Sequence, residues 1–192
     1  MLGIFLDTET NGLNALKHRL IEVAFKILDV EMGALRGEYS AILRISKEEW
    51  GRTDPESVRV NHFSWEEISA RGEAREVVAE AIVHAFTSLQ IARGTAVFIC
   101  QNPSFDRAFF AQIIDPDLQE KMVLPYHWLD LASMFWAERM RAGSTPWETG
   151  ITKDKIAAFY RLPPEAKPHR AMNGVDHLIA CYEAVVGFPG LI

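Results

Sequence analysis

The chain has 192 residues, of which 48% are hydrophobic and 24% are charged, a composition typical of one soluble globular domain. Asp and Glu number 26 against 20 Lys and Arg, which gives a formal net charge of −6. This acidity argues against broad contact with duplex phosphates and against a polybasic membrane-binding surface. It leaves a small, local nucleic-acid site open, because the net charge does not say where the charges lie.

The first residues and the cysteines indicate a cytoplasmic protein. The apolar run that opens the chain meets Asp7 at once, so it is too short for a signal peptide, and no run approaches the ~20 apolar residues of a membrane helix. Cys100 and Cys181 are too few for a disulfide framework or a zinc cluster. We therefore expect two buried, reduced thiols and no association with a membrane.

The first quarter of the chain predicts three strands. Residues 4–7 form a continuous apolar run that ends before the turn signal Asn11-Gly12. Residues 21–27 alternate between larger apolar and other side chains, which is typical of a strand with one buried face. Residues 39–45 resemble a third strand, and the glycine turn before them predicts an antiparallel hairpin within residues 20–45.

The remainder predicts helices with one further buried strand. Apolar residues at helical spacing indicate an amphipathic helix over 74–89, and residues 96–100 read as a buried strand. Asn102 and Pro103 then resemble an N-cap and a first helical residue, with the helix running to about residue 114. Further helices are expected over 130–141, 153–160 and 173–186. This order predicts an α/β fold in which helices cover a mixed sheet.

Two acidic residues lie at the end of the first predicted strand. Asp7 and Glu9 are two positions apart, so a strand would project both side chains from the same face. Adjacent buried carboxylates repel each other unless a cation compensates them, and oxygen ligands of this kind hold Mg²⁺. The alternative is that one of the two caps the following turn, and this segment alone leaves both interpretations open.

Three further residues favour the metal site when they are taken together. Asp106 and Asp176 each fall in the first turn of a predicted helix, and His169 lies in a loop framed by prolines. Each has an ordinary explanation, because acids favour helix starts and loop histidines are usually solvated. In a layered α/β fold, however, the end of the first strand and two helix starts can meet at one sheet edge. Four carboxylates there would hold two metal ions about 3.5–4 Å apart, beside a histidine able to accept a proton.

Three motifs give the chain a recognisable family resemblance. They stand at residues 5–13 (FLDTETNGL), 101–110 (QNPSFDRAFF) and 169–176 (HRAMNGVD). In this order the chain resembles the DnaQ-like, or DEDDh, 3′–5′ exonucleases, whose fold is ribonuclease-H-like. The resemblance covers essentially the whole chain. It implies a mixed five-stranded sheet with an antiparallel hairpin and flanking helices, in one exonuclease domain over residues 1–192.

The resemblance also implies a site and a reaction. Members of the family remove mononucleotides from free 3′ ends, which here implies single-stranded DNA or RNA ends as the partner. Two Mg²⁺ or Mn²⁺ ions would be bound by Asp7, Glu9, Asp106 and Asp176, with His169 as the general base. Residues expected to contact the terminal nucleotide are Thr10, Asn11, Gly12, Leu13, Phe105, Phe109 and Phe63. For Phe63, packing against the following helix is an equally open interpretation.

The third motif departs from the family pattern. The family separates the histidine from the last aspartate by four residues, whereas six lie between His169 and Asp176. We interpret this as a two-residue insertion in the loop, which keeps Asp176 as the fourth ligand. A literal alignment from His169 would instead place Gly174 at the aspartate position. His177 is the alternative base, although a helix would turn it about 100° away from Asp176.

The sequence leaves two other functions open. A catalytically silent module on the same fold would bind nucleic acid or protein, and the altered third motif is the feature in its favour. An endonuclease with the same metals would cut circular single strands. The choice between DNA and RNA is open, and so is a homodimer, which many members of the family form.

Overall fold

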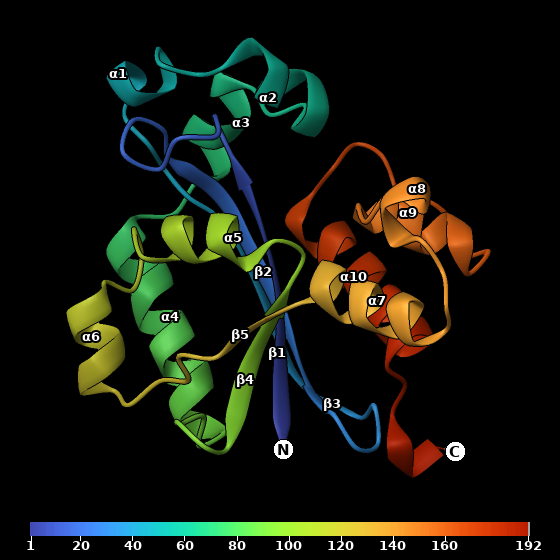
Figure 1. Cartoon of the computed structure of the whole chain (residues 1–192). Helices are drawn as coiled ribbons and strands as arrows, with labels where there is room; N and C mark the ends of the chain where they lie inside the picture. The colour runs from blue at the N-terminus through green and yellow to red at the C-terminus, as the bar shows by residue number, and fades with distance from the viewer. Residues whose placement is uncertain (192) are drawn as a thin grey trace.

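A mixed five-stranded sheet in the order β3-β2-β1-β4-β5 forms the centre of the chain. The structure is a computed structural model, and it describes residues 1–191. Helices cover both faces of the sheet, and three short helices lie beyond the end at which β1 finishes (Figure 1). The strands are β1 (Leu2–Thr10), β2 (Leu20–Asp29), β3 (Leu35–Ile42), β4 (Ala96–Cys100) and β5 (Trp128–Asp130).

The pairing of β1 leaves an opening at one end of the sheet. β1 pairs with β2 along its whole length in antiparallel register, from Leu2 opposite Asp29 to Thr10 opposite Leu20. Its parallel pairing with β4 ends much earlier, at Phe5 opposite Ile99. The last part of β1 therefore has a free edge on the β4 side, where side chains from neighbouring helices can reach it.

Alternation along β1 separates two hydrophobic cores. Ile4 and Leu6 point to the face covered by α4 (Arg75–Ser88) and α5 (Pro103–Phe110), with α6 (Pro116–Lys121) outside them (Figure 1). Phe5 points to the opposite face, which is covered by α7 (Leu131–Arg141), α9 (Lys153–Phe159) and α10 (Ala171–Val185). Because neighbouring strand residues face opposite sides, a β1 residue with the parity of Phe5 faces α10.

A third, smaller core lies under the short helices. It contains Phe63 and Ile68 together with Ile21, Ile42 and Ile45 of the hairpin strands and their continuation. The short helices are α1 (Lys47–Trp50), α2 (Pro55–Asn61) and α3 (Trp65–Arg71). The remaining elements are α8 (Pro146–Thr149) and a 3-10 turn at Pro189–Leu191.

The structure confirms the predicted fold class, the hairpin and the five-stranded mixed sheet. The predicted helices over 130–141, 153–160 and 173–186 begin and end within two residues of α7, α9 and α10. The first strand is longer than predicted because β2 continues to pair with it past Asp7 and Glu9. The third strand lies at 35–42 instead of 39–45, and α5 ends at Phe110 instead of near residue 114.

Two smaller predictions have different outcomes. Asn102 does not cap α5 with its side chain, because its backbone is left-handed and its Oδ1 accepts a bond from Ser104 Oγ instead. Cys100 and Cys181 are both free and buried, as predicted. Among residues 1–191, no helix is long and apolar enough to cross a membrane.

Candidate active site

A pocket of ≈ 280 Å³ lies at the free edge of β1. Four of the five predicted catalytic residues line it, Asp7, Glu9, Asp106 and His169, and so does Phe105 of the predicted nucleotide contacts. Lys153 and Glu165 line it as well, and the sequence did not suggest either of them. The pocket therefore joins β1 and α5 from the first half of the chain to α9 and the loop before α10 from the second half.

β1 supplies the first two carboxylates from its α10-facing side. Asp7 and Glu9 share the parity of Phe5, so both side chains project toward α10. Glu9 lies opposite Glu22 of β2, and Glu22 Oε2 accepts a hydrogen bond of 2.8 Å from the backbone N–H of Ala171, the first residue of α10. This bond anchors the start of α10 beside the two carboxylates.

Asp106 reaches the pocket from the other face of the sheet. Pro103 starts α5 immediately after β4, which places Asp106 in the first helical turn. The residue is only 4% exposed, and Thr8 Oγ1 donates a hydrogen bond of 2.7 Å to its Oδ1. Thr8 lies between Asp7 and Glu9 on β1, so this bond holds Asp106 against the same stretch of strand.

Burial and mutual repulsion make these three acids hard to ionise. Burial is the main cause that raises the pKa of Asp7, although Lys153 opposes it. Burial, with Asp7 and Glu22 nearby, raises the pKa of Glu9 to about 8. Burial and then Asp7 raise the pKa of Asp106 well above its usual value. Without a cation the protonated forms of these acids are therefore favoured, because the protein itself compensates their negative charge only in part.

Glu165 orients the predicted base. Its side chain is 4% exposed, and its Oε1 lies 3.0 Å from His169 Nδ1 while its Oε2 lies 2.8 Å from Lys153 Nζ. Burial opposes its charge, but His177, Lys153 and His169 together lower the pKa of Glu165 to about 2. A carboxylate at Nδ1 favours the proton on that nitrogen, which leaves His169 Nε2 as the acceptor.

His177, the alternative base, is buried away from the pocket. Its Nε2 lies 3.1 Å from the carbonyl oxygen of Pro163, and its Nδ1 lies 3.6 Å from Glu165 Oε2. Both ring nitrogens of His177 thus face residues of the loop before α10, whereas His169 lines the pocket.

Asp176 does not join the other three carboxylates, which corrects the prediction that it is the fourth ligand. Its Oδ1 forms an ion pair with Lys26 Nζ of β2, and its side chain is 55% exposed. α10 already begins at Ala171, so no inserted loop residues separate His169 from the helix. Residues two apart on a helix point about 200° apart, so a helix that directs residue 174 at Asp7 directs Asp176 elsewhere.

Gly174 stands where the literal alignment places the aspartate. A β-carbon built on Gly174 would lie 2.2 Å from Asp7 Oδ2. The start of α10 therefore agrees with the literal alignment, in which a glycine stands at the position where the resemblance predicts an aspartate. Within residues 1–191, no three His, Cys, Asp or Glu side chains form a ready-made metal cluster.

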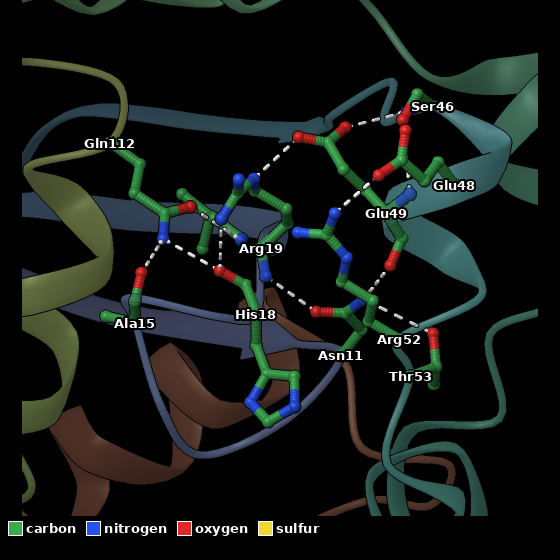
Figure 2. Close-up of polar contacts among 11 residues, drawn as sticks. Asn11, Ala15, His18, Arg19, Ser46, Glu48, Glu49, Arg52, Thr53 and Gln112 are labelled. Atoms are coloured by element: carbon green, nitrogen blue, oxygen red, sulfur yellow. Dashed lines mark hydrogen bonds and ion pairs between the residues drawn. The ribbon is translucent and has the colours of Figure 1, made fainter.

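The loop that follows β1 is held rigidly by polar contacts (Figure 2). Asn11 is fully buried; its Oδ1 accepts from Arg19 N at 2.6 Å and its Nδ2 donates to Glu49 O at 3.0 Å. Gln112 Nε2 donates to the carbonyls of Ala15 and His18 at 2.9 Å and 3.0 Å. The loop is therefore tied to α1 and to the segment that follows α5.

Some of the residues predicted to contact the nucleotide are accessible to a substrate, and others are buried. Leu13 is 77% exposed at the tip of the loop, and Phe105 lines the pocket. Thr10 and Gly12 bond to each other, with Thr10 Oγ1 donating to Gly12 O at 2.8 Å, and both are buried.

Two of the predicted aromatic contacts are instead part of the protein core. Phe109 is fully buried in the core under α4 and α5. Phe63 is 1% exposed, and the guanidinium of Arg170 lies 3.8 Å from its ring centroid. These side chains are therefore not available to a substrate, and for Phe63 the packing interpretation is the correct one.

Comparisons with known proteins bear on the fold. E. coli exonuclease I in complex with a dT13 oligonucleotide superposes with a TM-score of 0.79 at 20% identity, over 99% of this chain and 42% of that one. Cell-death related nuclease 4 gives a TM-score of 0.75 at 16% identity, over 95% and 62%. The zinc-ion-bound form of the E. coli exonuclease I complex with single-stranded DNA gives 0.71 at 20% identity, over 96% and 40%.

These likenesses establish a shared fold, the ribonuclease-H-like fold that the motifs predicted. The chain spans less than half the length of exonuclease I. No family model matches the sequence, and no curated protein matches it.

Proposed function

We propose that this chain, which has the ribonuclease-H-like fold, is a metal-dependent 3′–5′ exonuclease that removes mononucleotides from single-stranded or short nucleic acid. The observation that carries the proposal is that Asp7, Glu9, Asp106 and His169 line one pocket. Exonuclease I, which shares the fold, is described in complex with a dT13 oligonucleotide. Single-stranded DNA or RNA is accordingly the proposed substrate.

The three carboxylates have the chemistry to bind a divalent cation, although within residues 1–191 they do not already form a metal cluster. Among the described residues, Lys153 forms an ion pair with Asp7, but no cationic side chain forms one with Glu9 or Asp106. Buried carboxylates without a counter-charge are costly, and hard cations such as Mg²⁺ and Mn²⁺ prefer oxygen ligands. Asp7, Glu9 and Asp106 would hold such an ion, which would supply positive charge to stabilise the phosphodiester as negative charge develops on it.

The protein side chains have two further tasks. His169 accepts the proton of the attacking water at Nε2, because Glu165 occupies its Nδ1 side. The rigid loop after β1 presents Leu13 to the terminal sugar or base, with Phe105 at the pocket wall. This arrangement grips a few terminal nucleotides and requires no basic groove, which agrees with the net charge of −6.

The test is the degradation of matched 5′-labelled DNA and RNA oligonucleotides in Mg²⁺ or Mn²⁺. We expect a ladder that shortens from the 3′ end, uncut circular single strands, and loss of activity by about 10²–10⁴-fold in His169→Ala. Asp7→Asn should abolish cleavage. Cleavage of circles would indicate an endonuclease, and equal activity in Asp7→Asn would contradict the assigned site.

A second candidate function is a catalytically silent module that binds nucleic acid or protein. Gly174 in place of a carboxylate and the Lys153 ammonium beside Asp7 are the observations that favour it. The discriminating measurement is oligonucleotide binding by fluorescence anisotropy, run beside the cleavage assay. Tight binding with no cleavage in either metal would support the silent module.

Three sequence-based expectations stay predictions. They are that residues 1–192 form one exonuclease domain, that the protein is cytoplasmic, and that a homodimer is a possible assembly. Size-exclusion chromatography with light scattering tests the last of these directly.

A further inference from the structure

Lys153 occupies a cation position at the floor of the pocket. It is the first residue of α9, and its side chain is 13% exposed. Its Nζ lies 3.4 Å from Asp7 Oδ1, 2.8 Å from Glu165 Oε2 and 3.2 Å from the carbonyl oxygen of Gly174. An ammonium has three N–H donors, and here each faces an oxygen from a different segment of the chain.

Two carboxylates lie beside this ammonium. Asp7 and Glu165 are both within ion-pairing distance of Lys153 Nζ, and each favours its charged form. Two carboxylates and a carbonyl are also the kind of oxygen set that binds a hard metal ion.

The ammonium lies next to the position that lacks the expected fourth carboxylate. Gly174 contributes its carbonyl to Lys153, while Asp7 Oδ2 lies where a side chain of residue 174 would be. With glycine at this position the site lacks one negative charge that the family resemblance predicts, and Lys153 adds a positive charge beside Asp7 Oδ1.

We propose that Lys153 replaces one of the two expected metal ions, so that the site binds a single divalent cation through Asp7, Glu9 and Asp106. This inference rests on the proposed function, which identifies the pocket as a metal-dependent site. It changes the number of metal ions expected there from two to one. A structural ion pair that merely fastens α9 to Glu165 is the competing explanation. That explanation predicts the same metal count with and without the lysine.

The experiment counts Mn²⁺ ions bound per chain, from the loss of the free-ion electron paramagnetic resonance signal during a titration of the full chain. We expect one Mn²⁺ for the wild type. Lys153→Ala removes the ammonium and leaves its three oxygens open, so the count should rise to two. Lys155→Ala, an exposed lysine on the same helix, is the matched control and should stay at one.

Each outcome decides the proposal. Two Mn²⁺ ions in the wild type, or none, would overturn it even if Lys153→Ala does not fold. A count of one in a Lys153→Ala protein with an unchanged circular dichroism spectrum would also overturn it, because the ammonium would then exclude nothing. One bound ion without cleavage of any oligonucleotide would refute the exonuclease proposal and leave intact the proposal that Lys153 replaces a metal ion. Two bound ions with 3′–5′ cleavage would support the exonuclease proposal and refute the replacement by Lys153.

Discussion

A β-carbon on Gly174 would lie 2.2 Å from Oδ2 of Asp7, so the Asp7 carboxylate occupies the space that any side chain at position 174 needs. Helix α10 can approach β1 this closely only because residue 174 is a glycine. The placement of Asp7, and through it the shape of the pocket, thus depends on a residue with no functional group of its own.

Gly174→Ala should separate activity from stability. In an ordinary helix interior this change stabilises the protein by about 1 kcal/mol. Here the new β-carbon forces the Asp7 carboxylate to rotate, which offsets that gain and misplaces the carboxylate. We expect the free energy of unfolding in urea to change by less than about 1 kcal/mol while cleavage falls about 100-fold, as a misplacement of roughly 1 Å can cause. Wild-type cleavage in this variant would show that the pocket tolerates a displaced Asp7.

Asp176→Asn should behave almost as the wild type does. The Asp176 side chain is 55% exposed and pairs with Lys26, and such surface pairs contribute about 0–1 kcal/mol. We expect unchanged cleavage and unchanged Mn²⁺ binding. The variant should be slightly less stable than the wild type, and this difference should shrink as salt screens the ion pair. The matched comparison is Asp106→Asn, which should lose both. A loss of Mn²⁺ binding in Asp176→Asn would restore it as a ligand.

The fold and three carboxylates of the site could be predicted from local sequence patterns. Strand alternation placed Asp7 and Glu9 on one face, and the Asn-Pro helix start placed Asp106 in a first turn. These predictions hold because they depend only on the geometry of a single element. The layered α/β architecture then predicted that the end of the first strand and the start of the helix with Asp106 meet at one edge of the sheet.

The errors have a different origin, because they depend on how elements pack. Asp176 was assigned by assuming that extra residues lie in a loop, whereas α10 begins at Ala171 and its rotation directs residue 174 at Asp7. Phe109 was expected beside the terminal nucleotide, but the core under α4 and α5 buries it. Lys153 and Glu165 gave no local signal for their contact, since it joins the start of α9 to an irregular segment.

The stability of the metal-free protein should fall as pH rises. Burial, Asp7 and Glu22 raise the pKa of Glu9 from 4.5 to about 8, so the folded state holds a proton that the unfolded chain releases above pH 4.5. The stabilisation is complete below about pH 4.5 and is lost as the pH rises through 8. One pKa unit corresponds to about 1.4 kcal/mol, so the shift from 4.5 to about 8 corresponds to a loss of about 5 kcal/mol.

Urea unfolding at a series of pH values, in chelator, measures this dependence. Glu9→Gln should flatten it, and Mn²⁺ at pH 8 should recover the lost stability by binding the folded state. The raised pKa values of Asp7 and Asp106 act in the same direction. The lowered pKa of Glu165 stabilises the folded state by a constant amount above pH 4.5, and this stabilisation is lost as the pH falls from 4.5 towards 2. A stability that increases between pH 5 and 8 without metal would contradict the assignment.

Phe63 should matter for stability and not for substrate binding. It is 1% exposed in the third core, and Arg170, the residue before α10, lies over its ring. Phe63→Ala should lower the free energy of unfolding by about 3–5 kcal/mol. The milder Phe63→Leu should keep the fold, and its KM for an oligonucleotide should equal that of the wild type. A raised KM in Phe63→Leu would return the residue to the substrate site.

Leu13 should matter for substrate binding and not for stability. It is 77% exposed on a loop that Asn11 and Gln112 anchor, so its side chain contributes little to the folded state. A base or sugar packed on it would bury much of that apolar surface, and losing a leucine contact costs roughly 1–2 kcal/mol, or about 5–30-fold in KM. Leu16 is 92% exposed on the same loop and is the matched control. We expect Leu13→Ala to raise KM with an unchanged melting temperature, and Leu16→Ala to change neither; equal effects in the two variants would mean that the loop tip contributes only general hydrophobicity.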